Sequence, residues 1–390
     1  MSKLEELIEQ YCPDGVEYVK LGDFATQWYR GAGIKKDEIS QEGIPCIRYG
    51  EIHTIYKIWF DKCISHTDEA KQPSKKYADY GDILFAITSE DIPFIGNSVA
   101  YMGKERIMVG GDIVVMKHTQ NPKYISYALS TIDAVGQKGK GKVKSKVVHT
   151  NVPSLKEIVI PVPPLPVQEE IVRILDAFTE LQAELQAELQ KRRQQYNYYL
   201  DNLLNFNRGG QTEVKWMKMS EVAQVCRGTR VVKSQLSNKG YPVYQNCLTP
   251  MGYYDKANCK GGTPFVICGG AAGNVGYSIV DYWAADDCEC IVSGSEVCNK
   301  YLYYYLMTKQ DYLSSQVRKA SVPRLSPIVI KDLVIPIPSL DEQQRIVSIL
   351  DRFDTLTNDL TAGLPAEIEK RRQQYEYYRD KLLTFKRKEA

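Results

Sequence analysis

The strongest constraint in this sequence of 390 residues is an internal repeat. The segment IPVPPLPVQEEIVRILDAF at 160–178 returns as IPIPSLDEQQRIVSILDRF at 335–353, and KRRQQY at 191–196 returns unchanged at 370–375. A repeat of this length is the signature of a structural unit that is used more than once. The chain is therefore expected to fold as two equivalent units, each a globular part followed by a long helix.

Each copy of the repeat continues with the spacing of an amphipathic helix. In the first copy, two interleaved rows of mainly apolar residues recur every seven positions between 171 and 206, which is the pattern of a coiled-coil seam. In the second copy, Gly363-Leu364-Pro365 interrupts the pattern, which predicts a break after which Pro365 opens a new helical segment. Each helical region spans roughly 40 residues, or about 60 Å. The residues expected on the seam are Ile171, Leu175, Phe178, Leu185, Tyr196, Tyr199, Leu203, Ile346, Leu350, Phe353, Tyr375, Tyr378 and Leu382.

Between the helical regions the pattern is that of strands. Short apolar runs at 81–87, 111–116 and 263–268 are bounded by Gly, Pro or Asp, and a short helical stretch is expected at 301–312. We therefore predict an α+β protein, in which two α/β globular parts with mostly antiparallel sheets are separated by two long helices. The helices would form an antiparallel coiled coil with pseudo-twofold symmetry. The predicted boundaries are 1–158 and 211–333 for the globular parts, and 159–210 and 334–390 for the helical regions.

Composition and charge narrow the classes of function. Hydrophobic residues make up 43% of the chain and charged residues 25%, as in globular proteins, and the acidic, amphipathic start MSKLEELIEQY is unlike a signal peptide. We therefore expect a cytoplasmic protein without a membrane segment. Ten cysteines without a CxxC pair and four histidines without HExxH spacing predict no metal site. A net charge of +2 is low for a stand-alone nucleic-acid binder, so DNA contact would need local positive charge or a partner.

Three segments suggest chemistry, but local structure explains each of them better. Asn121-Pro122-Lys123-Tyr124 lacks the second proline of an amino-methyltransferase motif and is interpreted as a turn before a helix. The glycine-rich run at 269–276 lacks the GxGxxG and GK[ST] spacings, which favours a tight hairpin or bulge. The acidic run at 286–290 has no basic residue to complete a nuclease site and is interpreted as a solvated turn. No catalytic residue is predicted.

The repeated motifs resemble those of the specificity (S) subunits of type I restriction-modification systems. The resemblance covers nearly the whole chain. It rests on the two segments at 160–178 and 335–353 that open the helices, on KRRQQYNYYLDNLLNF and KRRQQYEYYRDKLLTF that close them, and on the opening MSKLEELIEQYCPDGVEYVKLGDF.

The resemblance implies a division of labour among subunits. The parts at 1–158 and 211–333 would be target-recognition domains, each reading one half of a bipartite, asymmetric site in double-stranded DNA. The helices would space these domains and dock two copies of the modification subunit. N6-adenine methylation and ATP-dependent cleavage would belong to the modification and restriction subunits. This chain would then hold no cofactor, and S-adenosylmethionine, ATP and magnesium would be bound by its partners.

Candidate DNA contacts follow from the distribution of basic residues. Lysines alternate with small or apolar residues from 136 to 146, and in an extended segment this period of two places them on one face. A solvated lysine loop is the alternative. Arginine pairs with guanine through two hydrogen bonds, so Arg30 beside Gly31 and the two arginines of the CRGTR segment at 226–230 are candidates for base or phosphate contact, and Arg48 belongs to a second cluster. An ordinary surface arginine is the alternative for each. The predicted DNA-binding residues are Lys138, Lys140, Lys142, Lys144, Lys146, Arg30, Arg48, Arg227, Arg230, and, before the second IPxP segment, Arg318, Lys319, Ser321 and Arg324.

Two alternative functions remain open at the level of sequence. One is a coiled-coil scaffold that does not read DNA sequence, in which case exchanging the globular parts would leave DNA preference unchanged. The other is a self-contained DNA methyltransferase, which would bind S-adenosylmethionine by itself.

Overall fold

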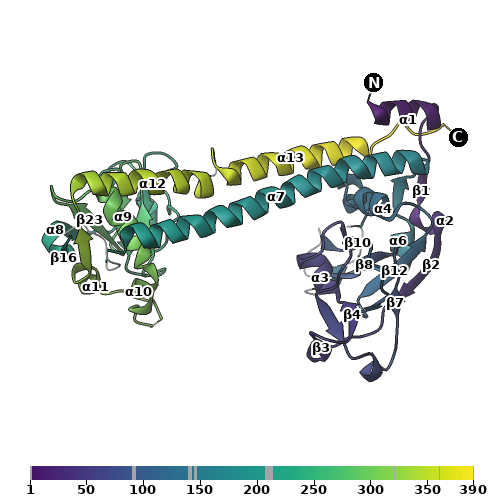
Figure 1. The fold of residues 1–390 in the computed structure, drawn as a ribbon, viewed down its shortest axis with the longest axis horizontal. Helices are drawn as coiled ribbons and strands as arrows, with labels where there is room; N and C mark the ends of the chain where they lie inside the picture. Colours follow the sequence, from purple (N-terminus) through teal and green to yellow (C-terminus); the bar gives the residue numbers. More distant parts are fainter. Residues whose placement is uncertain are drawn as a thin grey trace. The chain divides into compact units, whose positions relative to one another are not determined.

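The structure is a computed structural model that describes residues 2–89, 94–138, 143–144, 147–206, 214–319, 321–359 and 361–389. The chain divides into two compact units. Unit 1 consists of Met1–Glu184 with Glu369–Ala390, and unit 2 consists of Leu185–Ile368. Helix α7 (Leu165–Leu204) gives its first half to unit 1 and its second half to unit 2 (Figure 1). Each unit therefore combines strands and short helices with a stretch of long helix.

Unit 1 contains two five-stranded sheets with mainly antiparallel pairing. The first has the order β2 (Ala25–Arg30), β12 (Ile113–His118), β8 (Ile83–Ala86), β10 (Ser98–Tyr101) and β5 (Trp59–Phe60). The second has the order β3 (Ile39–Ser40), β6 (Ser65–Thr67), β4 (Ile44–Ile47), β11 (Ile107–Val109) and β7 (Tyr77–Ala78). Only the pairs β10 with β5 and β11 with β4 are parallel within these two sheets. The predicted strands at 81–87 and 111–116 are confirmed as β8 and β12.

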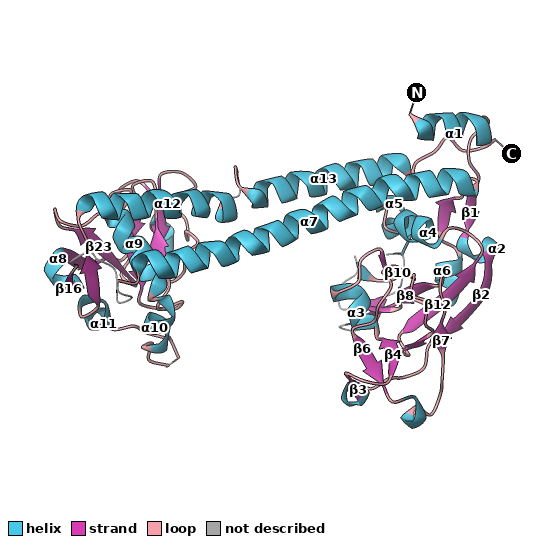
Figure 2. Ribbon diagram, in the orientation of Figure 1, coloured by secondary structure: helices cyan, strands magenta, loops and turns pink. Residues whose placement is uncertain are grey.

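The remaining elements of unit 1 connect these sheets to the long helices. Its shorter strands are β1 (Tyr18–Lys20), β9 (Thr88–Ser89), β13 (Val143–Lys144), β14 (Val147–His149) and β15 (Val159–Pro161). Its helices are α1 (Lys3–Tyr11), α2 (Leu21–Phe24), α3 (Tyr49–Thr54), α4 (Pro122–Leu129), α5 (Ile132–Lys138) and α6 (Val152–Lys156), with 3-10 turns η1 (Lys36–Glu38) and η2 (Glu69–Lys71). Helix α4 packs against β10 and β8 and lies beside α7 (Figure 2). The Tyr127 hydroxyl of α4 donates a hydrogen bond of 2.8 Å to Asp176 of α7.

Unit 2 repeats this plan with fewer strands. One sheet has the order β17 (Ala223–Arg227), β23 (Cys288–Ser293), β20 (Pro264–Ile267) and β21 (Val275–Tyr277), and a second has the order β19 (Tyr253–Tyr254), β18 (Tyr241–Tyr244) and β22 (Trp283–Ala284). Strand β16 (Lys215–Lys218) pairs with β24 (Val334–Ile337). The helices are α8 (Met219–Val222), α9 (Asn299–Thr308), α10 (Gln310–Ser315) and α11 (Pro327–Lys331), with the 3-10 turn η4 (Lys233–Gln235). The strand predicted at 263–268 and the helical stretch predicted at 301–312 are therefore confirmed.

The long helices pair along apolar seams inside each unit. In unit 1, Phe178 stacks on Tyr378 of α13 (Leu364–Leu382) with ring centroids 5.7 Å apart, and Gln182 donates to the Arg371 carbonyl oxygen at 3.4 Å. The contacting residue of α13 has a lower number at the later position of α7, so the two helices are antiparallel. In unit 2, Tyr199 stacks on Phe353 of α12 (Leu340–Asn358) at 5.0 Å.

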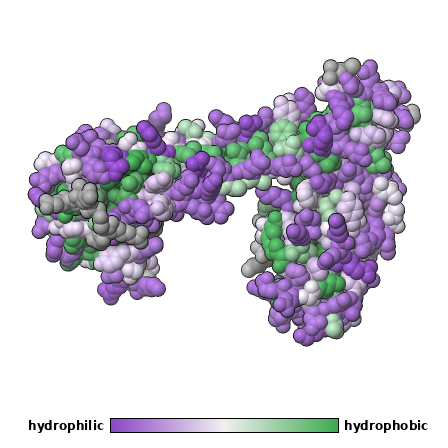
Figure 3. Space-filling model, viewed as in Figure 1, coloured by the Kyte–Doolittle hydropathy of each residue, from purple (hydrophilic) through white to green (hydrophobic). Residues whose placement is uncertain are grey.

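Other predicted seam residues fill the cores. Ile171 and Leu175 are fully buried in unit 1, where Tyr375 and Leu382 pack against them. In unit 2 the buried core includes Tyr196, Ile346 and Leu350, with Leu203 packed beside it, whereas Leu185 is half-buried. Hydrophilic residues cover most of the face of each unit seen in Figure 3. Within the described residues, no helix is both long and apolar enough to cross a membrane.

The predicted break in the second helical region is confirmed between α12 and α13. Helix α12 ends at Asn358, and α13 begins at Leu364 with Pro365 as its second residue, where proline is tolerated because the amide lacks a helical partner. A Cβ atom on Gly363 would lie 2.3 Å from the Thr355 carbonyl oxygen. Glycine therefore permits the close approach that joins the two helices.

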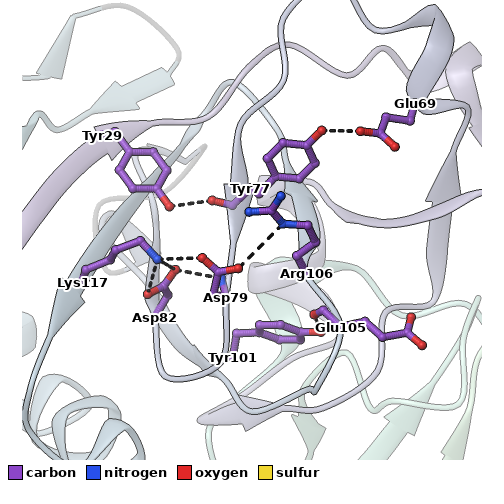
Figure 4. Close-up of polar contacts among 9 residues, drawn as sticks. All are labelled: Tyr29, Glu69, Tyr77, Asp79, Asp82, Tyr101, Glu105, Arg106 and Lys117. Carbon is purple, nitrogen blue, oxygen red and sulfur yellow. Dashed lines mark hydrogen bonds and ion pairs between the residues drawn. The ribbon is translucent and has the colours of Figure 1, made fainter.

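A polar network links the two large sheets of unit 1 (Figure 4). Lys117 of β12 donates to Asp79, which follows β7, at 3.0 Å and to Asp82, which precedes β8, at 2.9 Å. The Asp82 side chain is only 6% exposed. The Tyr29 hydroxyl of β2 donates to the Tyr77 carbonyl oxygen of β7 at 2.5 Å. The network therefore fixes the short connection by which the chain passes from one sheet to the other.

Replacing the lysine of this network should destabilise unit 1. The variant Lys117→Met leaves the buried Asp82 carboxylate without its cation, and breaking a buried ion pair in this way costs about 3 kcal/mol. Urea denaturation followed by circular dichroism would measure the loss. Lys104→Met, at an exposed position of the same unit, is the matched control and should change the midpoint little. Equal effects of the two substitutions would show that the network contributes nothing to stability.

Candidate nucleic-acid interface

In unit 1 the edge strand β2 ends in an arginine, Arg30, which is followed by a glycine. The Arg30 side chain is 61% exposed, forms an ion pair of 2.8 Å with Asp112, and donates from Nε to the Gly111 carbonyl oxygen. The next residue, Gly31, donates its backbone N–H to Ile113 at 2.8 Å. A Cβ atom there would lie 2.2 Å from the Gly110 carbonyl oxygen, so only glycine fits. The backbone contact therefore sets where the Arg30 side chain leaves the sheet.

A second predicted arginine, Arg48, lines a cavity together with Arg30. Arg48 directly precedes α3, and together with Arg30, Tyr49 and Asp112 it lines a cavity of about 470 Å³. Glycines at 31, 33, 110 and 111 supply much of the remaining wall, so backbone atoms are accessible to a ligand. Among the described residues, the Arg48 guanidinium has no acidic partner. The structure thus brings together two arginines that are 18 positions apart in the sequence.

Unit 2 repeats the arginine-glycine arrangement. Arg227 ends β17 and donates from Nε to the Asp286 carbonyl oxygen at 2.9 Å. Gly228 donates its N–H to Cys288 at 2.9 Å, and a Cβ atom there would lie 2.2 Å from the Ala285 carbonyl oxygen. Arg227 and Gly228 are therefore the structural equivalents of Arg30 and Gly31.

The acidic residue beside this arrangement is used differently in the two units. In unit 1 Asp112 pairs with Arg30, whereas in unit 2 the equivalent Asp287 pairs with Arg324 at 3.1 Å. The backbones of Arg318 and Arg324 exchange hydrogen bonds of 2.8 and 3.2 Å, so both predicted arginines lie in one small hairpin. The remaining predicted residues of unit 2 are exposed, namely Arg230, Lys319 and Ser321. Sequence reasoning missed Asp112 and Asp287, although each directly precedes a predicted or observed strand.

The expected lysine face is not extended where the structure describes it. Lys138 is the last residue of helix α5, is only 6% exposed, and donates to the Ser98 hydroxyl at 3.3 Å. Burial lowers the pKa of Lys138 to about 7. The prediction of an extended, solvent-facing Lys138 is therefore wrong, because the helix turns its side chain into the protein. Lys144 lies in strand β13. Lys140, Lys142 and Lys146 lie outside the described residues.

The three segments considered for catalysis have structural explanations. Asn121 caps helix α4 by accepting a hydrogen bond from the Tyr124 N–H at 3.1 Å. The predicted helix is confirmed, but it begins at Pro122, so residues 122–124 are helical and do not form the predicted turn. The glycine-rich run lies at the turn between the antiparallel strands β20 and β21, which confirms the predicted hairpin. The prediction of a solvated turn at 286–290 is wrong for Cys288 and Cys290, because both are buried in the interior strand β23. No group of three or more possible metal ligands occurs within the described part of the chain.

Each unit also contains a cavity where the long helix of the repeat ends. In unit 1 it has a volume of about 560 Å³ and is lined by Tyr18, Thr131, Ile132, Asp380 and Thr384 among others. In unit 2 a cavity of about 440 Å³ is lined by Trp216, Thr308, Lys309, Asp201 and Asn205 among others. We call these the helix-end cavities.

The helix-end cavities are built from equivalent elements. Tyr18 lies opposite Pro161 in the β1–β15 pair, and Trp216 lies opposite Pro336 in the β16–β24 pair. Both walls expose apolar surface, since the Ile132 side chain is 74% exposed in unit 1 and the Trp216 side chain 43% in unit 2. The molecule therefore presents two versions of one concave surface.

The chain is similar in sequence and in fold to several known proteins. The family model described as type I restriction modification DNA specificity domain matches residues 13–192 and 211–370. The specificity subunit of a type I restriction enzyme of Escherichia coli is 34% identical over 297 residues, which cover 69% of this chain and 72% of that protein. A protein of Mycoplasma pneumoniae described as a type I specificity subunit is 33% identical over 57% of this chain and 92% of its own length. The crystal structure of the S subunit of a type I system from M. genitalium covers 95% of this chain and 96% of its own, with 15% identity and a TM-score of 0.63, which shows a shared fold.

The placement of Lys138 predicts a pH dependence of stability. Its pKa is about 7 in the folded chain and about 10.4 when unfolded, so between these values the unfolded chain binds more protons. The free energy of unfolding should therefore rise with pH from 7 toward 10 by about 1.4 kcal/mol per pH unit from this group. Lys138→Met should remove that slope and leave DNA affinity unchanged. Urea titrations at pH 7, 8 and 9 would measure it, with the exposed Lys57→Met as control; identical slopes in all three proteins would contradict the burial of an uncharged lysine.

Proposed function

This chain belongs to the type I restriction-modification DNA specificity family, and we propose that each of its units reads one half of a bipartite, asymmetric site in double-stranded DNA. The observation that carries the proposal is the repeated arginine-glycine arrangement. Arg30 and Arg227 leave equivalent strands in equivalent directions, because Gly31 and Gly228 make the same close backbone contacts. Arginine side chains held in this way suit guanine edges or phosphates.

The differences between the units support an asymmetric site. Unit 1 presents Arg48 over a cavity of about 470 Å³, whereas unit 2 presents Arg318 and Arg324 on a hairpin beside Asp287. The same backbone frame therefore carries two different arrangements of charge. Two recognition surfaces that differ in this way would prefer different base sequences.

We propose that the chemistry of the system belongs to partner subunits. The family is one of specificity subunits, which are not catalytic, and its members named above are parts of type I restriction enzymes. In the proposed complex, modification subunits bind S-adenosylmethionine and methylate adenine at N6, and restriction subunits use ATP and magnesium to cleave DNA. A scaffold that ignores DNA sequence and a self-contained methyltransferase are not favoured, because the relatives are specificity subunits.

We further propose that the two helix-end cavities receive two copies of the modification subunit. Two copies of one partner need two equivalent surfaces, and these cavities are formed by the repeated parts of the chain. The surfaces combine exposed apolar groups, such as Trp216, with carboxylates at Asp201 and Asp380. Each cavity is also lined by a basic side chain, Arg387 in unit 1 and Lys309 in unit 2, so an apolar side chain flanked by polar groups is the partner chemistry that fits both.

The reading function can be tested by mapping methylation. The chain is co-expressed with its modification subunit, and N6-methyladenine is mapped across the host genome, with the modification subunit alone as control. We expect a split motif that requires both chains. Arg48→Ala should relax or weaken one half of the motif and Arg227→Ala the other, each by about 5- to 150-fold if the lost contact is a bidentate arginine-guanine pair.

Matched substitutions at exposed lysines control for loss of charge. Lys57→Ala in unit 1 and Lys256→Ala in unit 2 should leave the motif unchanged. If Arg48→Ala and Arg227→Ala altered the same half of the motif, one unit would not correspond to one half-site. If no new methylation came from an assembled complex, the reading function itself would be refuted.

The docking surfaces can be tested by filling each cavity. Thr131→Trp in unit 1 and Thr308→Trp in unit 2 place a large ring where the partner side chain would enter. Each substitution should reduce the complex from two modification subunits to one, and the double variant should bind none. Native mass spectrometry would count the subunits. Ile279→Trp, at a position 85% exposed in unit 2, is the control, and unchanged stoichiometry in the double variant would place the docking surface elsewhere.

A further inference from the structure

Two cysteines of unit 2 lie in direct contact. The sulfur atoms of Cys259 and Cys290 are 2.6 Å apart, although the residues are 31 positions apart in the sequence. Cys290 lies in strand β23 and is 1% exposed, whereas Cys259 is only half-buried and lies on the connection between β19 and β20. Cys259 therefore lies at the edge of the core, and Cys290 is enclosed by it.

The backbone around Cys259 is held firmly. Cys259 and Tyr282 exchange two backbone hydrogen bonds, both of 3.0 Å. The preceding residue, Asn258, accepts from the Ala284 N–H at 2.7 Å and donates to the Ala284 carbonyl oxygen at 2.8 Å. These hydrogen bonds therefore hold the Cys259 backbone beside Tyr282, where its sulfur contacts that of Cys290.

The surroundings favour a reactive thiol at Cys259. The hydrogen bond with Cys290 lowers the pKa of the Cys259 thiol below its ordinary value, while the same contact and burial raise the pKa of Cys290. The Tyr282 hydroxyl lies 3.5 Å from the Cys290 sulfur and donates to the Thr263 carbonyl oxygen at 3.1 Å. Cys259 is thus the more acidic thiol of the pair, and the thiolate is the form that reacts with oxidants.

We propose that Cys259 and Cys290 form a redox-active pair that is converted to a disulfide by peroxide. The Cys259 thiolate attacks one peroxide oxygen, the O–O bond breaks, and the hydroxide that leaves takes up a proton to become water. The Cys290 sulfur then attacks the Cys259 sulfenic acid, forming the S–S bond and releasing a second water. Overall, two thiols lose two electrons and two protons, and one hydrogen peroxide is reduced to two waters. A dithiol reductant reverses the step by thiol-disulfide exchange.

The pair is specific to one unit. Ile113 and Cys288 are equivalent residues, because each carbonyl oxygen accepts a hydrogen bond from the equivalent glycine, Gly31 or Gly228. Two residues further along each strand, Val115 of β12 is therefore the equivalent of Cys290 of β23. In unit 2, Cys290 lies opposite Cys226 in the β17–β23 pair, next to the opposed residues Arg227 and Glu289. The disulfide would therefore join the 255–263 connection to the strand that supports the candidate arginine of unit 2, and would leave unit 1 unaffected.

The test uses the full chain, reduced and then treated with hydrogen peroxide. Intact mass should fall by about 2 Da, the two thiol hydrogens, and a peptide map without reduction should show one cross-link between Cys259 and Cys290. Thermal denaturation should shift one transition upward by about 5 °C, because the disulfide closes a loop within unit 2. Dithiothreitol should reverse both changes.

Substituted chains identify the sulfurs. Cys259→Ser and Cys290→Val, the second copying unit 1, should abolish the cross-link and the thermal shift. Cys247→Ser, which removes another half-buried thiol of unit 2, should retain both. A wild-type chain that gains oxygen mass without the cross-link, or that cross-links other cysteines instead, would overturn the proposal; this outcome is read on the wild-type chain and does not depend on folding of the variants.

Discussion

The side-chain amide of one buried glutamine in each unit joins the globular part to its long helix. Gln168 in unit 1 donates to the Pro163 carbonyl oxygen at 2.7 Å and accepts from the Asn121 N–H at 3.0 Å. Gln343 in unit 2 donates to the Pro338 carbonyl oxygen at 2.9 Å and accepts from the Cys298 N–H at 2.9 Å. Both side chains are fully buried, so an unpaired amide there would cost roughly 1–3 kcal/mol. This requirement explains why proline and glutamine recur together at the start of each helix.

Helices α4 and α9, which are rich in tyrosine, are held by the same glutamine contacts. Tyr124 donates to the Pro161 carbonyl oxygen at 3.0 Å and Tyr301 to the Pro336 carbonyl oxygen at 2.8 Å, and each lies in a helix whose start is held by the buried glutamine. Because these helices pack between the sheet and the long helix, each recognition part is attached rigidly to its own stretch of long helix. Within each unit, the sheet and the adjoining stretch of long helix are therefore held together by side-chain contacts.

Charge is used sparingly at the candidate DNA surface. Arg30 pairs with Asp112 and Arg324 with Asp287, so these cations already have partners before DNA arrives. If these arginines contact DNA as proposed, each must exchange a carboxylate for a phosphate or a base edge, and the net attraction is smaller than for an unpaired arginine. The net charge of +2 is consistent with this economy.

Repeats, heptad spacing and proline chemistry can be recognised without knowledge of distant contacts, so they predict the tandem plan, the long helices, the break at Pro365 and several strands. The sequence also identified Arg30, Arg48 and Arg227 as candidates from their residue type and neighbours. The folded chain is needed to show which of these arginines share a cavity, that Asp112 and Asp287 pair with different arginines, and that Lys138 is buried. It also shows that Cys288 and Cys290 lie in a core strand, although their acidic neighbours suggest a surface turn. These outcomes depend on which strands pair across the sheet, and that pairing is set by packing among segments distant in the chain.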